Sequence, residues 1–339
     1  MKAAVFRRQN EMATAEVPKP SPGPGEVVLK VHNCGICGSD LHAVQFGFGM
    51  EPNTVMGHEF CGEIHEIGPG VSGFKVGERV TSLPYISCGQ CEFCLRGLGM
   101  RCAEIRGLGL GQLPGAYAEF VLCGAGSLLK LPDKVSSREG ALVEPLSVGL
   151  HGVNRAGLKP GAVCIVMGAG PIGLATLLWC KARGAQTVVV SELAEGRAEL
   201  AKKLGATAVV NPNKENPAGK VRELAGREPD IVFECIGVKS TLDAAIGMLA
   251  PEGRVVVLGV CMEPDTITPV ACILKEVGID FVLGYNRGEF EETIAALATG
   301  RINAKPMITD VIPVDQVPAM LEALRKPTTQ GKVMVEFPH

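Results

Sequence analysis

Four cysteines lie close together in one short stretch of the chain, and no other feature constrains the fold as strongly. They follow the spacing C-x2-C-x2-C-x7-C within 15 residues, at Cys88, Cys91, Cys94 and Cys102. Four thiols at this spacing can surround one tetrahedral soft cation, which is how closed structural zinc sites are built. The same stretch carries three residues that suit a loop wrapped around an ion, Gly89, Gly97 and Gly99. We therefore expect a zinc lobe over residues 88–102 that folds only with its metal.

Disulfides, redox thiols and an iron–sulfur cluster are the alternatives for these cysteines. Nothing in the chain indicates export, which argues against disulfides. The ferredoxin run closes with an x3 spacing and a Cys-Pro pair, whereas this run closes with an x7 spacing and Cys102-Ala103. The spacing therefore favours structural zinc.

Length and composition describe a globular protein of two domains. A chain of 339 residues is too long for one ordinary core. The formal net charge is −3, and no run of Lys and Arg is long enough to neutralise a phosphate backbone. Aromatic residues make up only 4%, which also argues against base stacking. We expect no nucleic-acid partner.

The remaining cysteines, together with the lack of a signal-peptide core or a membrane span in the sequence, favour a cytoplasmic protein. Five cysteines stand in apolar or small-residue surroundings, where a free thiol acts as a small core residue: Cys164, Cys180, Cys235, Cys261 and Cys272. The first eight residues show no apolar signal-peptide core. The uncharged stretch 160–180 imitates a membrane span, but its glycines and Pro171 would break a helix there. We expect no membrane association.

The hydrophobic pattern changes near residue 148. Before it, short β-like runs alternate with turn signals, as in Val27–Val31 after Pro22-Gly23-Pro24-Gly25, which predicts an antiparallel barrel. After it, apolar strands alternate with helices, which predicts a parallel sheet covered on both faces. The predicted strands are 162–167, 187–191, 208–210, 230–234, 254–259 and 281–283; the predicted helices are 173–183, 194–204, 240–249 and 289–299, and 331–337 is a closing strand.

A glycine fingerprint follows the first of these strands. Residues 168–173 read Gly-Ala-Gly-Pro-Ile-Gly, a G-x-G-x-x-G motif that opens an apolar helix. Gly168 permits the tight turn, Gly170 lets the backbone reach a pyrophosphate, and Gly173 lets the helix pack on the strand. With Pro171 and Ile172 at the helix start, the diphosphate would sit at the positive end of the helix dipole. The alternative is a plain tight turn.

The next strand ends in an acid that favours NAD. Glu192 lies 19 residues after Gly173, where a carboxylate accepts hydrogen bonds from the adenosine ribose and repels a 2′-phosphate. Arg197 is the competing signal, because a nearby Arg could accommodate that phosphate. We interpret Arg197 as an ordinary charge on the following helix and predict NAD.

The remaining chemistry is concentrated in residues 36–42, Ile-Cys-Gly-Ser-Asp-Leu-His, and 57–59, Gly-His-Glu. They are followed, in this order, by the four-cysteine lobe, the run Val-Glu-Pro-Leu-Ser-Val-Gly at 143–149 and the glycine fingerprint. In these motifs and their order, the chain resembles the zinc-dependent medium-chain alcohol dehydrogenases over essentially its whole length. It looks closest to the sorbitol, butanediol and threonine dehydrogenase branch, because it offers Glu144 where other alcohol dehydrogenases place a cysteine.

The resemblance implies a catalytic zinc in addition to the structural one. It assigns Cys37 and His58 as ligands, with Glu144 or Glu59 completing the set. One thiolate, one imidazole and one carboxylate leave the open position that catalytic zinc needs. Asp40 matches the residue that fixes the imidazole of the zinc histidine.

Further implied roles concern the proton path and the cofactor phosphates. Ser39 and His42 match a relay that passes a proton from the alcohol through Ser39, the cofactor ribose and His42. One residue departs from the pattern, because Gly38 stands where other members often have a basic pyrophosphate contact.

Simpler readings of these residues remain open. Ser39 could cap a helix that begins near Asp40, and His42 could be a surface histidine. Glu59 could stand near the metal and ligate it only in some states. We expect Cys34 to be a core thiol, and His65 and His151, which lie outside any motif, to be structural.

These inferences predict an α/β chain with a GroES-like antiparallel β-barrel catalytic domain, residues 1–147 and 286–339, and a Rossmann doubly wound parallel six-stranded sheet, residues 148–285. We expect a homotetrameric enzyme with two zinc ions per chain, one catalytic and one structural, that interconverts an alcohol and its ketone or aldehyde with NAD. A secondary alcohol, vicinal diol or polyol is expected by resemblance alone. The alternatives are a zinc-free enone or quinone reductase and an inactive regulatory homologue.

Overall fold

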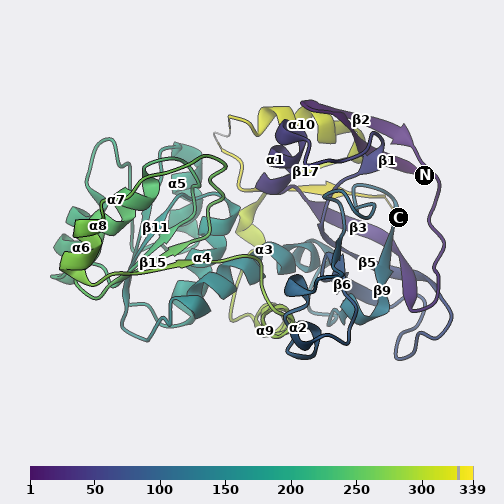
Figure 1. Cartoon of the computed structure of the whole chain (residues 1–339), viewed down its shortest axis with the longest axis horizontal. Coiled ribbons are helices and arrows are strands. Elements are labelled where there is room, and N and C mark those ends of the chain that lie inside the picture. Colours follow the sequence, from purple (N-terminus) through teal and green to yellow (C-terminus); the bar gives the residue numbers. More distant parts are fainter. Residues whose placement is uncertain (327–328, 339) are drawn as a thin grey trace.

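The computed structural model describes residues 1–326 and 329–338. Figure 1 shows two parts side by side, a parallel sheet flanked by helices on the left and a group of mainly antiparallel sheets on the right. The C-terminal elements, in yellow, return to the right-hand part beside the N-terminal strands. The mixed α/β class and the two kinds of sheet predicted from the sequence are confirmed.

The left-hand part is built on a six-stranded sheet whose strands all run parallel. The strand order β13-β12-β11-β14-β15-β16 is the doubly wound order of dinucleotide-binding folds. The strands are β11 (Val163–Met167), β12 (Thr187–Ser191), β13 (Ala208–Val210), β14 (Ile231–Glu234), β15 (Arg254–Val257) and β16 (Gly278–Phe281). Its helices are α4 (Pro171–Ala182), α5 (Glu195–Lys203), α6 (Pro217–Ala225), α7 (Thr241–Met248) and α8 (Pro269–Lys275).

The last strand differs from its prediction. The sequence pattern placed it at 281–283, but β16 covers Gly278–Phe281 and Leu283 lies beyond it, 78% exposed. Asp280 explains the shift, because its carboxylate accepts hydrogen bonds from Arg155 (2.8 Å) and Arg254. A polar segment is therefore held on the sheet by charge pairs, which an apolar pattern does not reveal.

The right-hand part contains three sheets, of seven, three and two strands. The seven-stranded one has the order β10-β6-β5-β3-β18-β17, and β9 also pairs with β3. Pairing is antiparallel except between β17 and β18, which run parallel. Bounds are β1 (Lys2–Arg8), β2 (Glu11–Glu16), β3 (Glu26–Gly35), β4 (Thr54–Val55), β5 (Glu59–Ile67), β6 (Arg79–Ser82), β7 (Tyr85–Ile86), β8 (Arg106–Gly107), β9 (Phe120–Gly124), β10 (Leu128–Lys130), β17 (Ile308–Ile312) and β18 (Lys332–Glu336). The helices are α1 (Gly38–Phe46), α2 (Glu92–Leu95) and α10 (Val317–Ala323).

A long buried helix that the sequence pattern did not predict lies between the two parts. α3 (Ser137–Arg155) packs against β3 and β5 on one side and against α4 and α9 (Arg287–Ala298) on the other. It begins at a capping box, in which the hydroxyl of Ser136 accepts from the backbone N–H of Glu139. The predicted boundary between residues 147 and 148 falls inside this helix. The division of the chain at that point stays a proposal.

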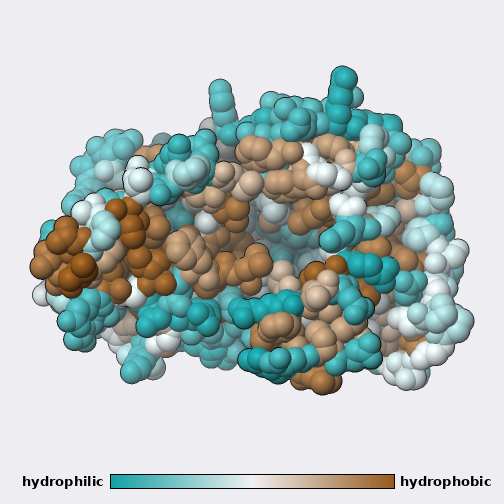
Figure 2. Space-filling view, in the orientation of Figure 1, coloured by the Kyte–Doolittle hydropathy of each residue, from teal (hydrophilic) through white to brown (hydrophobic). Residues whose placement is uncertain are grey.

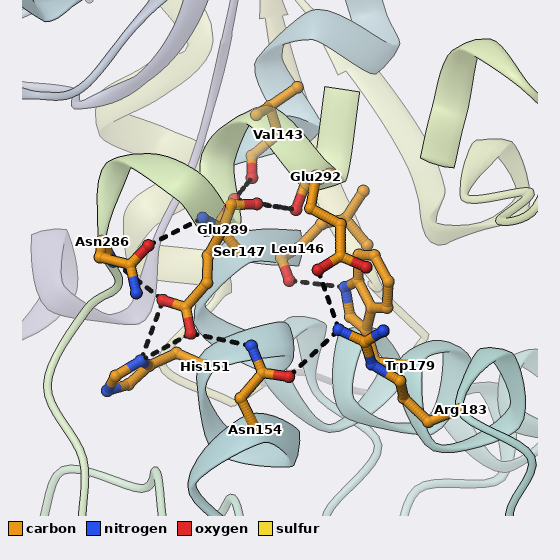
Figure 3. Close-up of polar contacts among 11 residues, drawn as sticks. Val143, Leu146, Ser147, His151, Asn154, Trp179, Arg183, Asn286, Glu289 and Glu292 are labelled. Carbon is orange, nitrogen blue, oxygen red and sulfur yellow. Dashed lines mark hydrogen bonds and ion pairs between the residues drawn. The ribbon is translucent and has the colours of Figure 1, made fainter. Parts of the chain in front are cut away.

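Polar contacts fix α9 against α3 and α4 (Figure 3). The carboxylate of Glu289 accepts a hydrogen bond from the amide of Asn154 (3.0 Å) and lies 3.0 Å from Nδ1 of His151. Arg183, the C-cap residue of α4, donates to Glu292 of α9 at 2.8 Å. His151 therefore has the structural contacts expected of it, and the segment just before α9 is held in place.

The thirteen cysteines are all free thiols. Cys34, Cys164 and Cys180 are buried as expected, but Cys261 is exposed, because it follows the end of β15 in a loop. His65 lies against the ring of Phe120, with the ring centroids 4.8 Å apart. Among the described helices, none combines the length and the apolar character that crossing a membrane would require.

The approach of α3 to α4 gives a prediction about stability. A Cβ at Gly149 would stand 2.8 Å from the backbone of Ala175 and Thr176, so Gly149→Ala must push the two helices apart. We expect a loss of about 1–3 kcal/mol, seen as a lower urea midpoint. Gly247→Ala in α7 is the matched control, because a Cβ there meets nothing within 4 Å. It should stabilise by roughly 0.4–1 kcal/mol or be neutral; equal midpoints for the two variants would contradict the packing argument.

Candidate active site and metal centres

The four cysteines of the lobe come together around α2. The Sγ–Sγ distances are 3.5 Å for Cys91 and Cys94, 3.5 Å for Cys88 and Cys102, and 3.9 Å for Cys88 and Cys94. A zinc–sulfur bond of 2.3 Å implies sulfur–sulfur edges of about 3.8 Å in a regular tetrahedron. The thiols are therefore spaced as a closed zinc site requires. Hydrogen bonding from Ser87 lowers the pKa of Cys94 to about 7. For Cys91, a backbone hydrogen bond from Cys94 lowers the pKa, but desolvation and the neighbouring thiols outweigh it and raise the pKa to about 11.

A second group of possible metal donors gathers at the start of α1 and β5. One ligand atom each of Cys37, His58 and Glu59 lies within 4.8 Å of the others. Cys37 comes two residues after β3, and His58 immediately precedes β5. Because β3 and β5 pair with Gly35 opposite Glu59, the sheet itself brings these distant residues together.

Asp40 orients the imidazole of His58. Its Oδ1 atom lies 3.3 Å from Nδ1 of His58, and its Oδ2 atom accepts from Tyr117 (2.6 Å) and from the backbone N–H of Cys37 (3.0 Å). Among the described residues, two buried polar side-chain atoms lack a well-aligned hydrogen bond, and they are these facing atoms, Oδ1 of Asp40 and Nδ1 of His58. Burial lowers the pKa of His58, but the charge of Asp40 outweighs it and the net pKa is raised well above 6.5. A cation beside the ring would take over the stabilisation of the Asp40 charge.

Ser39 and His42 are the second and fifth residues of α1. Ser39 Oγ is 3.3 Å from Nε2 of His58. The helix-cap reading of Ser39 is wrong, because the N-cap is Cys37 and Ser39 is already inside the helix. His42 is half-buried, and this burial lowers the pKa of its imidazole.

Glu144 projects from the middle of α3 and is not one of the three donors within 4.8 Å. The hydroxyl of Tyr285 donates to its Oε1 at 2.8 Å. Burial, and then the charge of Glu59, raise the pKa of Glu144 to about 7.

Sequence reasoning missed the buried cation of this site. The ammonium of Lys332, from β18, lies 2.6 Å from each carboxylate oxygen of Glu59 and donates to the carbonyl of Ile36 at 2.9 Å. Both Lys332 and Glu59 are buried, at 1% and 0% exposure. The available signal was a lysine directly before the apolar residues Val-Met-Val of the closing strand, since a buried lysine needs a partner.

The glycine fingerprint forms the turn between β11 and α4. Gly168 has a φ of 90°, which glycine adopts without strain. A Cβ at Gly173 would stand 1.9 Å from the carbonyl oxygen of Gly168, so the helix can meet the turn only at a glycine. Gly170 is the N-cap of α4, and Pro171 and Ile172 open the helix, as expected for a pyrophosphate-binding turn.

Glu192 and Arg197 lie beside this turn. Glu192 accepts from the backbone N–H of Ala169 at 2.7 Å, which ties the end of β12 to the turn. Arg197 differs from its expected role as an ordinary helix charge. It is half-buried, its Nε donates to the carbonyl of Gln330 at 2.7 Å, and its Nη1 lies 3.6 Å from the position of a Cβ on Gly170.

Comparisons with known proteins agree with this architecture. Residues 171–299 match the family model described as zinc-binding dehydrogenase, and residues 23–133 match the alcohol dehydrogenase GroES-like domain. Sorbitol dehydrogenase of Gallus gallus is 36% identical over 331 residues, which cover 96% of this chain and 93% of that protein.

Solved structures of similar proteins superpose over nearly the whole chain. The crystal structure of 2R,3R-butanediol dehydrogenase from Bacillus subtilis has a TM-score of 0.90 at 32% identity and covers 99% of both chains. A structure from Sinorhizobium meliloti 1021, described as a zinc-binding dehydrogenase bound to NADP, has a TM-score of 0.91 at 32% identity, again over 99% of both chains. The chain belongs to the zinc-dependent medium-chain alcohol dehydrogenases, in the branch that contains sorbitol dehydrogenase.

Proposed function

We propose that this protein is a zinc-dependent oxidoreductase that interconverts a secondary alcohol, vicinal diol or polyol and its carbonyl product with a nicotinamide cofactor. The observation that carries the proposal is the group formed by Cys37, His58 and Glu59, whose donor atoms lie within 4.8 Å. One thiolate, one imidazole and one carboxylate form the mixed donor set of a catalytic zinc that keeps a position for substrate. Figure 2 shows a hollow in the surface between the two parts, where both reactants could meet.

Each residue near the metal centre has a separate proposed task. Cys37 and His58 would hold the zinc, and Glu59 or Glu144 would supply the third donor. Zinc at this place would supply a Lewis acid that makes the hydroxyl of an alcohol more acidic. Ser39, 3.3 Å from the imidazole of His58, would accept the proton from the substrate hydroxyl. His42 would pass it on toward water, since it is the half-buried histidine of the same helix.

The two other functions considered from the sequence have less support. A zinc-free enone or quinone reductase would need neither donor group, yet both groups are assembled here. An inactive homologue would need no intact proton path, whereas Ser39, Asp40 and His58 lie together.

We propose that the turn at Gly168–Gly173 binds the diphosphate of NAD. The second oxygen of Glu192, Oε1, accepts from the backbone N–H groups of Leu193 and Ala194 at 2.7 and 2.8 Å, so the carboxylate is held rigidly at the end of β12. A fixed negative charge there disfavours a 2′-phosphate. Arg197 is already committed to Gln330 and faces Glu192, which limits its use for that phosphate.

A panel of alcohols, vicinal diols and polyols, assayed with NAD and with NADP at the NADH absorbance, tests the proposed activity and cofactor together. We expect turnover of a diol or polyol and a higher kcat/KM with NAD. Glu192→Ala should reduce the preference for NAD, because it removes the charge that repels the 2′-phosphate. Glu195→Ala, on the exposed start of α5, is the control and should leave the preference unchanged. No turnover with any alcohol would contradict the proposed reaction, and better use of NADP by the unaltered protein would reverse the cofactor assignment.

We propose two zinc ions per chain with unequal retention. The closed set of four thiolates offers no exchangeable position, whereas the set at Cys37 keeps one. Metal analysis of the purified protein should find two zincs, and a chelator should remove one much faster than the other. We call the zinc that the chelator removes first the fast zinc and the other the slow zinc. Cys37→Ser should lack the fast zinc and keep the slow zinc. One zinc or fewer in folded, active protein would contradict this.

We propose that the chain assembles as a homotetramer. The edge strand β16 has no partner on its outer side among the described residues. Large apolar side chains are exposed on α8 and next to it, where Figure 2 shows a brown area: Val270 (57%), Ile273 (72%), Leu274 (78%) and Phe281 (71%). Pairing of two β16 edges across a two-fold axis would continue the sheet and cover this area.

Light scattering at micromolar concentration should give a tetrameric mass for the unaltered protein. Leu274→Glu should lower that mass, because a charge would be buried in the contact. Val76→Glu, at an apolar residue 65% exposed in the other part of the molecule, should leave it unchanged. A monomeric mass for the unaltered protein would reject the assembly.

A further inference from the structure

The Lys332–Glu59 pair lies at the junction of three strands. β18, which carries Lys332, pairs with β17 on one side and with β3 on the other. Glu59 is the first residue of β5, which pairs with the far side of β3. The side chain of Lys332 therefore reaches Glu59 across the end of β3, immediately before Cys37.

The ammonium group uses all of its donors within this contact. A lysine ammonium carries three N–H groups. Three acceptors surround Nζ of Lys332, namely both carboxylate oxygens of Glu59 at 2.6 Å and the carbonyl oxygen of Ile36 at 2.9 Å. Removing either charged partner would leave the other buried without compensation, which is costly for an ion.

The backbone leaves room for this pair only because Gly35 has no side chain. A Cβ at Gly35 would stand 2.2 Å from Oε2 of Glu59 and 3.2 Å from Cδ of Lys332. Gly35 precedes Cys37 by two residues. The strand that delivers the thiol of Cys37 therefore also holds the Glu59 carboxylate against Lys332.

The carboxylate of Glu144 has fewer hydrogen-bond partners than the carboxylate of Glu59. Glu144 accepts a hydrogen bond from Tyr285 on Oε1, the one donor that the described residues give it. Glu59 has a buried cation on both oxygens, whereas Glu144 has a neutral hydroxyl on one. Of the two candidate ligands, Glu144 is the one whose negative charge is not already paired.

We propose that Lys332 is a positioning residue that competes with the metal for the carboxylate of Glu59. This inference rests on the proposed metal centre at Cys37 and His58. By pairing with both oxygens, Lys332 keeps Glu59 beside the donors and withholds its full charge from the metal. The metal would then be held less firmly, and would stay a stronger Lewis acid, than if the Glu59 carboxylate were unpaired.

Lys332→Met tests the competition, because it keeps an unbranched side chain and removes the charge. With Lys332 absent, Glu59 has no cation except the metal, so release of the fast zinc to a chelator should slow by about tenfold. The slow zinc of the four-cysteine lobe is an internal reference and should be unaffected. Lys130→Met, which removes a lysine 2.9 Å from Glu78 on the outside of the same sheet, should not change either rate.

A double-mutant cycle separates this role from a purely structural one. In a Glu59→Gln background there is no carboxylate to release, so adding Lys332→Met should change the rate of zinc loss by less than about twofold. A structural role would instead lower the thermal midpoint and speed up loss of both zincs in both backgrounds. Turnover provides a second readout, because a metal that Glu59 binds with its full negative charge would be a weaker Lewis acid, which should lower kcat.

The outcomes are distinguishable. Faster loss of the fast zinc from Lys332→Met would overturn the inference and leave the proposed function standing. If Lys332→Met does not fold, the Glu59→Gln variant decides the matter. It should keep the fast zinc. If it loses that zinc as completely as Cys37→Ser does, the inference is overturned. Absence of a second zinc from the unaltered protein would overturn the proposed function, and this inference with it.

Discussion

The rest of the structure depends on the close packing of α3 against both parts of the molecule. A Cβ at Gly140 would stand 2.5 Å from Leu131 and 3.0 Å from Cys61, and one at Gly149 would meet the backbone of α4. Glu144 lies between these two glycines. The helix backbone that carries Glu144 is therefore packed against the antiparallel part on one side and the parallel part on the other. The indole of Trp179, which donates to the carbonyl of Leu146 at 2.9 Å, adds a directional tie between α3 and α4 (Figure 3).

The same packing creates an electrostatic problem that a metal would solve. Asp40, Glu59 and Glu144 are acids buried within one region, and Lys332 is the buried cation beside them. Burial of several like charges with one counter-ion is unfavourable, and the raised pKa of Glu144 reflects it. A divalent cation at Cys37 and His58 would supply the missing positive charge. Asp40, whose Oδ1 lies 3.3 Å from Nδ1 of His58, would hold the imidazole in place for such a site.

Local signals in the sequence were sufficient for much of this account. Cysteine spacing predicted a thiol cluster that does form, and the glycine fingerprint predicted a strand, a turn and a helix in that order. α3 was missed because Gly140, Glu144, Pro145 and Gly149 interrupt the apolar period that marks a helix, even though most of the helix is buried. The Lys332–Glu59 contact could not be predicted, because it joins residues 273 positions apart through strand pairings that only the folded sheet defines. Contacts of that kind have no local sequence pattern.

The central claim is that the chain holds one metal in a closed thiolate site and another in a mixed, open site. X-ray absorption at the zinc edge measures both at once on the purified protein. The account predicts sulfur neighbours at about 2.3 Å together with nitrogen and oxygen neighbours at about 2.0–2.1 Å. Addition of a polyol should alter the nitrogen and oxygen shell alone. A spectrum with four sulfur neighbours per zinc and no lighter ligands would mean that only the lobe is loaded, and would contradict the proposed catalytic centre.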